Sequence, residues 1–255
     1  MGKVRADQLL VARGLAESRA RAQALIMAGL VFAGERKLAK AGEMLAEEAQ
    51  LDVRGRDHPW VSRGGVKLAH ALDHFAIKPE GIWLDIGAST GGFTDVLLAR
   101  GAERVIAVDV GTNQLAWKLR QDPRVTVHEQ TNARHLTAAH VPEPVEGIVC
   151  DASFIGLAKV LAVPLSFARG GAILIALVKP QFEASREEIG KGGVVRDPQV
   201  HARVCEEAAR WIAALGWEVL GITPSPITGP EGNVEFLLAA RKNEGAAESP
   251  PPPLG

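Results

Sequence analysis

From residue 81 onward, short apolar stretches with the composition of β-strands alternate with amphipathic stretches of helical length. The strand-like stretches are GIWLDIG at 81–87, RVIAVDV at 104–110, GIVCD at 147–151 and GAILIALV at 171–178. Strands that are apolar on both faces and separated by helices form a parallel sheet with helices on both sides. The alternation therefore predicts an α/β domain built on a doubly wound, Rossmann-like sheet.

The end of this pattern departs from a simple parallel sheet. The last strand-like stretch, NVEFLLAARK at 233–242, follows VLGITPSPI at 219–227 through a link rich in Pro and Gly. That link is too short for a crossover helix, which a parallel neighbour would need. We therefore expect the last strand to run antiparallel.

Composition limits the classes of protein to be considered. The chain has 255 residues, of which 47% are hydrophobic, and this suits one full-sized domain with a small appendage. We expect a cytoplasmic protein, because no apolar run reaches the ~18 residues of a membrane span and the N-terminus lacks the apolar core of a signal peptide. Two cysteines, Cys150 and Cys205, are too few for a disulfide framework or a zinc cluster, so buried thiols are expected.

The N-terminal segment predicts a small α+β module. Leu9 and Leu10 belong to a short helix that ends at Gly14, Ser18 can cap a second helix, and Gly29 can end it. Short strands are expected around residues 31–32 and 49–55. Residues 1–40 carry eight Lys or Arg against three Asp or Glu, a balance of +5 within a chain of net charge -1, so a local basic face is predicted.

These patterns divide the chain into four parts. We expect the small module at 1–57, a linker at 58–63, the α/β domain at 64–242 and a disordered, Pro-rich tail at 243–255.

A Gly-rich turn between two strand-like stretches predicts a cofactor site. The first strand ends at Asp85, glycines at 87, 91 and 92 open a helix, and the second strand ends at Asp109. Glycines let the backbone approach a ligand closely, and an acidic strand end accepts hydrogen bonds from ribose hydroxyls, so a nucleoside-bearing cofactor is indicated. The spacing is not that of the dinucleotide fingerprint. Asp85 as a helix cap and Asp109 as a solvated charge are the structural alternatives.

Further polar residues stand where apolar strands end. Asp151 ends GIVCD, Lys179 ends the strand before Pro180, and Glu235 interrupts the last strand. Because strand ends face the ligand crevice of an open α/β sheet, Asp151 and Lys179 are expected to converge there, and an antiparallel last strand would present Glu235 at the same edge. Lys67 completes a Lys, Asp, Lys, Glu set. Taken singly, they also fit a helix cap, a surface strand end and an edge-strand charge.

The ordered set of motifs resembles a known family. The spacing D-x-G-x-x-x-G-G-F-T resembles motif I of S-adenosylmethionine methyltransferases, and the Lys, Asp, Lys, Glu set resembles the catalytic tetrad of FtsJ-like ribose 2'-O-methyltransferases. Five segments together resemble the TlyA family, often labelled hemolysin: VSRGGVKLAHAL at 61–72, DIGASTGGFTDVLL at 85–98, CDASFIGL at 150–157, LVKPQFEA at 177–184 and SPITGPEGNVEFLL at 225–238. The resemblance spans residues 3–240. It departs from the family at Ala33-Gly34, where Asn-Gly is common, and at Trp60.

The resemblance implies a fold, a reaction and a set of site residues. It implies a seven-stranded methyltransferase sheet with an antiparallel last strand behind an S4 RNA-binding domain, and S-adenosylmethionine-dependent methylation of cytidine 2'-hydroxyls in ribosomal RNA, with ribosomal subunits as partners and neither metal nor membrane. The implied catalytic residues are Lys67, Asp151, Lys179 and Glu235. The implied cofactor-binding residues are Asp85, Gly87, Ala88, Ser89, Gly91, Gly92, Phe93 and Asp109. The implied RNA-binding residues are Arg5, Arg13, Arg19, Arg21 and Arg63.

Residue chemistry suggests how such a site works. A ribose hydroxyl is a weak acid, so methyl transfer to it needs alignment and help in removing the proton. Lys179 is the candidate for that help, Lys67 is a second cation that favours its neutral form, and Asp151 and Glu235 orient both amines. We expect Gly64 and Gly65 to turn the linker sharply so that Lys67 reaches the crevice; ordinary helix-start charges at Arg63 and Lys67 are the alternative.

Two other functions remain open at this point. One is a membrane-active hemolysin or cytolysin, which the family label suggests. The other is a non-catalytic ribosome-assembly factor that binds RNA and cofactor without turnover.

Overall fold

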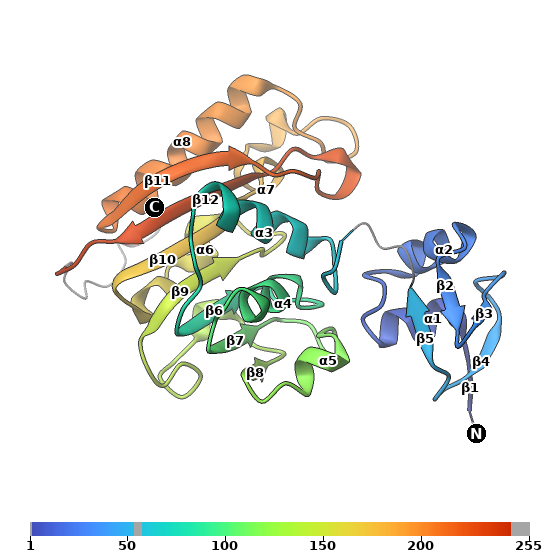
Figure 1. The fold of residues 1–255 in the computed structure, drawn as a ribbon. Helices are drawn as coiled ribbons and strands as arrows, with labels where there is room; N and C mark the ends of the chain where they lie inside the picture. The colour runs from blue at the N-terminus through green and yellow to red at the C-terminus, as the bar shows by residue number, and fades with distance from the viewer. Residues whose placement is uncertain (1, 54–57, 246–255) are drawn as a thin grey trace.

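The computed structural model describes residues 2–53 and 58–245. They form a small module at the N-terminus and a large α/β domain, which lie side by side (Figure 1). The expected module boundary at residue 57 and most of the expected disordered tail fall on residues 54–57 and 246–255, outside the described ranges. Within those ranges, no helix is long and apolar enough to cross a membrane.

The large domain is built on a seven-stranded sheet with the order β11-β12-β10-β9-β6-β7-β8. Its strands are β6 (Ile82–Ile86), β7 (Arg104–Val108), β8 (Val125–His128), β9 (Val145–Cys150), β10 (Ala168–Val178), β11 (Trp217–Pro224) and β12 (Phe236–Lys242). The pairs from β10 to β8 are parallel, whereas β12 runs antiparallel to both β10 and β11. The predicted Rossmann-like sheet with an antiparallel last strand is thus confirmed.

Helices cover both faces of this sheet (Figure 1). One face carries α3 (Gly64–His74), α4 (Gly92–Ala99) and α5 (Trp117–Arg120), and the other carries α6 (Leu157–Leu161), α7 (Pro180–Glu183) and α8 (Pro198–Ala214). Alternate side chains of each strand enter the two cores: Trp83 packs under α3 and α4, and Leu84 packs with α6 and α8. This period of two explains why the central strands read as unbroken apolar runs.

Two elements of the domain differ from the apolar pattern. The edge strand β8 has the sequence VTVH, too short and too mixed to be recognised as a strand from its residues. The amphipathic stretch at 156–168 forms α6 and then a separate 3₁₀ helix, Pro164–Phe167, because Pro164 cannot continue an α-helix.

The N-terminal module has its own apolar core. Helices α1 (Ala6–Ala12) and α2 (Arg19–Met27) pack on five short strands, β1 (Lys3–Arg5), β2 (Val31–Ala33), β3 (Arg36–Lys37), β4 (Met44–Ala46) and β5 (Leu51–Val53). The Ser18 hydroxyl accepts the Arg21 N–H and so caps α2, and both Gly14 and Gly29 have positive φ just after a helix. Strands β1, β3 and β4 are too short for a sequence pattern to reveal.

The linker leads directly into α3, which packs closely on α4, and this changes the role expected of Gly64 and Gly65. Neither Gly64 nor Gly65 has positive φ, so the expected sharp turn is wrong: both lie in the first turn of α3. A Cβ on Gly65 would stand 2.5 Å from the Trp60 Cβ, and one on Gly92 at the start of α4 would stand 2.8 Å from the Gly65 amide nitrogen. These glycines are therefore needed for close packing.

This packing predicts different results for two adjacent substitutions. Gly65→Ala should lower the free energy of unfolding by about 1–3 kcal/mol, because the new methyl group overlaps the Trp60 side chain. Gly64→Ala is the matched control, since its Cβ would meet nothing closer than 3.4 Å and Ala favours helix. Urea unfolding monitored by Trp fluorescence measures both, and equal stabilities of the two variants would contradict the packing account.

Candidate active site

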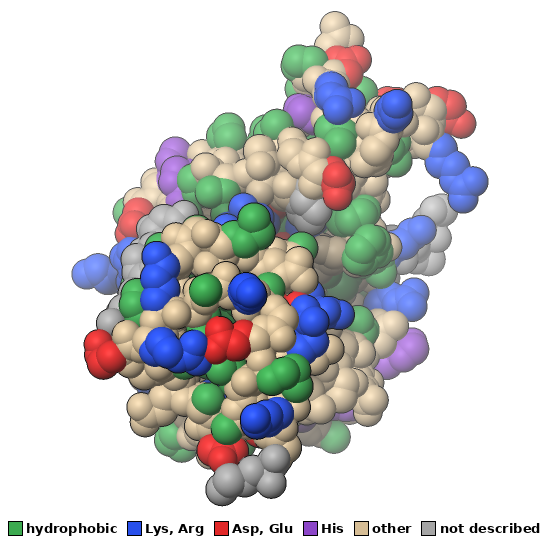
Figure 2. All heavy atoms as spheres, turned by 90° about the vertical axis from the view of Figure 1, so that its right-hand side faces the viewer, with side chains coloured by type: hydrophobic (Ala, Val, Ile, Leu, Met, Phe, Trp, Pro, Cys, Tyr) green, Lys and Arg blue, Asp and Glu red, His purple; other side chains and the backbone are tan. Residues whose placement is uncertain are grey.

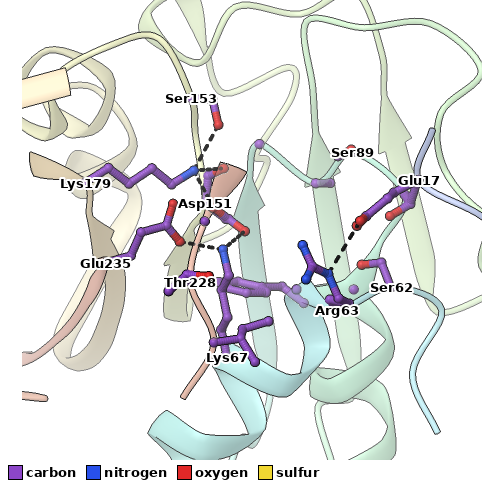
Figure 3. A pocket seen from close by; sticks show the side chains of 18 residues that line it. Glu17, Ser62, Arg63, Lys67, Ser89, Asp151, Ser153, Lys179, Thr228 and Glu235 are labelled. Carbon is purple, nitrogen blue, oxygen red and sulfur yellow. Dashed lines mark hydrogen bonds and ion pairs between the residues drawn. The ribbon is translucent and has the colours of Figure 1, made fainter. Parts of the chain in front are cut away.

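The side chains of Lys67, Asp151, Lys179 and Glu235 meet in a cavity of about 270 Å³ at the edge where the parallel strands end (Figure 3). Lys67 Nζ lies 2.6 Å from Glu235 Oε2 and 3.9 Å from Asp151 Oδ2. Lys179 Nζ lies 2.6 Å from Asp151 Oδ1. The Asp151 carboxylate thus lies between the two amines, and the structure brings the four predicted residues into one network.

The topology of the sheet explains this convergence. Asp151 and Lys179 directly follow the parallel strands β9 and β10, and Pro180 starts α7 immediately after Lys179. Glu235 precedes β12, and because β12 is antiparallel its first residues lie at the same edge. Lys67 comes from α3, which the linker brings against the sheet from outside.

Three of the four groups are almost completely removed from solvent. Lys67, Lys179 and Glu235 are 7%, 5% and 1% exposed. Charged groups buried to this degree need partners of opposite charge, since an unpaired one costs several kcal/mol. Two carboxylates facing two amines satisfy this need.

Lys179 has further acceptors that its sequence position did not reveal. Its Nζ donates to Ser153 Oγ at 2.9 Å and to the Asp151 carbonyl oxygen at 3.3 Å. Together with the Asp151 carboxylate, these oxygens match the three donors of an ammonium group. Ser153 lies three residues after the end of β9, within the CDASFIGL stretch, and these are the signals in the sequence that point to it.

The backbone at Gly229 passes close to the Glu235 carboxylate. A Cβ on Gly229 would overlap Glu235 Oε1, so Gly at this position leaves room for the carboxylate. Glu235 Oε1 itself has no hydrogen-bond partner among the described residues, whereas Oε2 accepts from Lys67. One buried oxygen of Glu235 is thus available to a ligand.

A second cavity of about 460 Å³ adjoins the first. Both cavities are lined by Gly87, Ser89, Asp151 and Ser153. The second also contains Asp109 and several residues that the sequence did not point to: Val110, Gln114, Thr131, Asn132, Phe154 and Ile155. They come from the loops after β7, β8 and β9. The loops after β7 and β8 carry no distinctive motif, whereas Phe154 and Ile155 lie in the CDASFIGL stretch, in which only Asp151 was assigned to the site. A ligand in the second cavity would therefore touch the wall of the first.

The Gly-rich loop forms this shared wall. Gly87 has a φ of 79°, and a Cβ there would stand 2.9 Å from the Ala152 amide nitrogen. Asp109 accepts hydrogen bonds from the backbone N–H groups of Ser89 at 2.8 Å and Gly111 at 2.7 Å. These hydrogen bonds hold the Gly-rich loop next to the Asp109 carboxylate, at the rim of the second cavity.

The structure distributes the other predicted cofactor residues unevenly. Ala88, Gly92 and Phe93 line the first cavity. Gly91 lines neither cavity: it has a φ of 91°, and a Cβ there would collide with Leu119 and Leu115. The left-handed conformation of Gly91 allows the Gly-rich loop to lead directly into α4.

Asp85 lies behind the loop and lines neither cavity. It is completely buried; its Oδ2 accepts from Thr94 Oγ1 at 2.6 Å, and its Oδ1 has no partner among the described residues. Burial raises the pKa of this carboxyl group to about 7, with the negative charge of Asp151 adding to the effect. A cation placed beside the loop would favour its ionised form.

Intramolecular partners occupy most of the arginines that were predicted to bind RNA. Arg5 and Arg19 pair with the buried carboxylate of Asp7, and Arg5 holds the pKa of that carboxyl group well below its usual range. Arg13 donates to the carbonyl oxygens of Glu47 and Ala49. Figure 2 shows basic side chains spread over the module with acidic ones between them. RNA contacts by these arginines stay a prediction.

Arg21 and Arg63 lie closer to the site. Arg63 lines the first cavity, and Arg21 lines a small neighbouring cavity between the module and the linker.

The chain is similar to known proteins over most of its length. Residues 60–242 match the model of the FtsJ-like methyltransferase family. The chain belongs to this family. It is 48% identical to the 16S/23S rRNA (cytidine-2'-O)-methyltransferase TlyA of Mycobacterium tuberculosis, over 94% of this chain and 90% of the relative.

Two further matches extend over most of the chain. YqxC of Bacillus subtilis, named as an rRNA methyltransferase, is 50% identical over 92% of this chain and 85% of the relative. A solved structure from Streptococcus thermophilus, named as a hemolysin, is 44% identical with a TM-score of 0.75 and covers 95% of this chain and 90% of that one. As an FtsJ-like methyltransferase, the chain is an enzyme.

The buried Asp85 predicts a specific pH dependence of stability. Its pKa is raised from 3.8 to about 7 in the folded protein, so the folded state binds more protons than the unfolded state between these values. The free energy of unfolding should therefore fall as pH rises through this window, by at most about 1.4 kcal/mol per pH unit from this group. Asp85→Asn should remove this component. Urea unfolding of both proteins across the window measures it, and parallel pH profiles would contradict the assignment.

The close approach at Gly229 predicts an effect on activity. Gly229→Ala should push the Glu235 carboxylate away from Lys67 and lower methyl transfer by about 100-fold, the typical cost of a displacement of about 1 Å in an active site. Gly170→Ala is the matched control, because Gly170 lies near the start of β10, away from the site, and its Cβ would meet nothing closer than 3.6 Å. Initial rates of both variants with labelled methyl donor test this, and a fully active Gly229→Ala would rule out the steric role.

Proposed function

We propose that this protein transfers the methyl group of S-adenosylmethionine to the 2'-hydroxyl of cytidine in ribosomal RNA. The observation that carries the proposal is the shared wall of the two cavities, where Asp151 and Ser153 face both the Lys67–Asp151–Lys179–Glu235 network and the pocket at Asp109. The names of two relatives, an rRNA methyltransferase and a cytidine-2'-O-methyltransferase, support it.

The residues around the second cavity fit this cofactor. Asp109 has a carboxylate at the rim that can accept hydrogen bonds from ribose hydroxyls, and Thr131 and Asn132 offer polar groups to a base. The orphaned oxygen of Asp85 lies behind the loop, where a positively charged ligand would stabilise it. When bound, S-adenosylmethionine supplies an electrophilic methyl group.

The network then acts on the ribose hydroxyl. Lys179 Nζ lies in the first cavity beside the shared wall, where its neutral amine is placed to accept the proton of the 2'-hydroxyl as the methyl group is transferred. The ammonium that forms then pairs with the Asp151 carboxylate. Ser153 is the uncharged side chain among its acceptors, so a ribose oxygen replaces it at least cost. Asp151 orients both amines, and the Glu235–Lys67 pair fills the rest of the buried site.

The N-terminal module supplies RNA binding in this proposal. The module at 1–57 acts as an S4-like domain, the linker at 58–63 joins it to the methyltransferase domain at 64–242, and the basic balance of residues 1–40 attracts the phosphate backbone. With ribosomal RNA or ribosomal subunits as the substrate, the enzyme works in the cytoplasm. The lysine and carboxylate network at the junction of the two cavities would have no chemical task in a hemolysin or in a non-catalytic assembly factor. It therefore favours the enzyme over both alternatives.

The direct test is methyl transfer to unmethylated RNA. The protein should transfer labelled methyl groups to ribosomal RNA transcribed in vitro or to ribosomal subunits, and nuclease digestion should yield 2'-O-methylcytidine by mass spectrometry. Label on a base, or none on either substrate, would overturn the proposal. Leakage from liposomes tests the hemolysin alternative.

Two substitutions of Lys179 separate base catalysis from positioning. Lys179→Ala should lower the rate by about 10²–10⁴-fold, the range typical of the loss of a general base. Lys179→Arg keeps the charge but does not release a proton near neutral pH, so it should be almost as slow. S-adenosylmethionine affinity by calorimetry should be unchanged in both. Substantial activity of Lys179→Arg would show that the residue only positions the substrate.

A further inference from the structure

One residue of the N-terminal module reaches the wall of the catalytic cavity. Among the described residues that line this cavity, Glu17 alone comes from the module, from the loop between α1 and α2, and the others lie at position 62 or beyond. Figure 3 shows its side chain at the side of the cavity opposite Lys179.

Glu17 is ion-paired with Arg63. Glu17 Oε1 lies 3.5 Å from Arg63 Nε, and the two side chains are 38% and 43% exposed. Arg63 is the N-cap residue of α3, one helical turn before Lys67. The pair therefore joins the module to the helix that carries a member of the catalytic network.

The backbone around this pair packs tightly against the large domain. A Cβ on Gly14, in the same loop as Glu17, would stand 2.9 Å from the Ala116 Cα. Arg21 and His58 lie with Glu17 and Arg63 around the small cavity between module and linker. The position of Glu17 beside the catalytic cavity is thus set by the contact between the module and the domain.

The charge of Glu17 is opposite to the one that an RNA-binding cleft needs. An RNA backbone brings phosphates to the cavity, and a carboxylate on the wall repels them. The Arg63 guanidinium suits a phosphate well, because its planar N–H groups match two oxygens of the same anion. The Glu17–Arg63 pair is long and exposed, and such pairs are weak and exchange readily for a better anion.

We propose that Glu17 occupies Arg63 in the RNA-free protein in the place of an RNA phosphate, and that a backbone phosphate of the substrate displaces it. This inference rests on the proposed function, because it names a contact of the RNA substrate at the same site. Glu17 is then a positioning residue: it keeps Arg63 directed at the cleft and its carboxylate leaves when a polyanion enters.

Four variants test the exchange. Glu17→Gln removes the competing charge, Arg63→Gln removes the shared partner, and the double variant closes the cycle. Glu43→Gln is the matched control: Glu43 also lies on the module, pairs with Arg36 at 2.6 Å and does not line the cavity. Equal urea unfolding of the single variants and the parent establishes that folding is unchanged.

The measured quantity is affinity for unmethylated ribosomal RNA transcribed in vitro, by filter binding over a series of salt concentrations. Glu17→Gln should tighten binding by about two- to fivefold at low salt, the range expected for one exposed ion pair. It should lower KM for RNA and leave kcat at saturating RNA unchanged. In the Arg63→Gln background, the gain should fall to that of Glu43→Gln.

The outcomes separate this inference from the proposed function. If the parent protein methylates RNA but Glu17→Gln gains no more than Glu43→Gln, or keeps its full gain without Arg63, the exchange is overturned and the function stands. If the parent neither binds nor methylates ribosomal RNA, both proposals fall.

Discussion

The Asp151 carboxylate contacts two buried lysines, and much of the architecture serves to make that contact possible. Lys67 and Lys179 are both more than nine-tenths buried, so each needs an anion within reach. Asp151 lies between them and Glu235 adds the second negative charge. Removing Asp151 would leave the buried Lys179 without a carboxylate partner, which costs several kcal/mol.

This requirement gives a reason for the antiparallel strand. A parallel β12 would begin at the opposite edge of the sheet and carry Glu235 away from the lysines. Because β12 is inserted between β10 and β11 in the reverse direction, its first residues lie beside the end of β10, where Lys179 stands. The same reversal brings the loop with Gly229 against the Glu235 carboxylate.

The linker is connected to the cofactor loop as well as to the catalytic network. The Val61 N–H donates to Asp95 Oδ2 at 2.9 Å, on the helix that starts directly after the Gly-rich loop. Gly65 and Gly92 let the first turns of α3 and α4 touch. The linker thus contacts both the helix that carries Lys67 and the helix that follows the Gly-rich loop, and the Glu17–Arg63 pair lies where the N-terminal module meets the linker.

The residue pattern by itself predicted the sheet class, the reversed last strand and the convergence of Asp151, Lys179 and Glu235, whereas the catalytic roles came from the resemblance to a family. Strand ends in an open α/β sheet share one edge, so polar groups after apolar runs predict a site without coordinates. Local patterns failed where an element is short, as in β8 and the module strands. They also failed where a glycine leaves room for another side chain, as Gly65 does for Trp60 and Gly229 does for Glu235.

Tertiary structure alone decided which charges meet. The excess of basic residues near the N-terminus predicted phosphate contacts, but Asp7 accepts from two of those arginines and Arg13 binds backbone carbonyls, which no count of charges reveals. The sequence likewise shows no relation between Glu17 and Lys67, whereas folding places both on one cavity. The physical reason is that periodicity and strand ends follow from neighbours along the chain, while ion pairs depend on segments brought together only by packing.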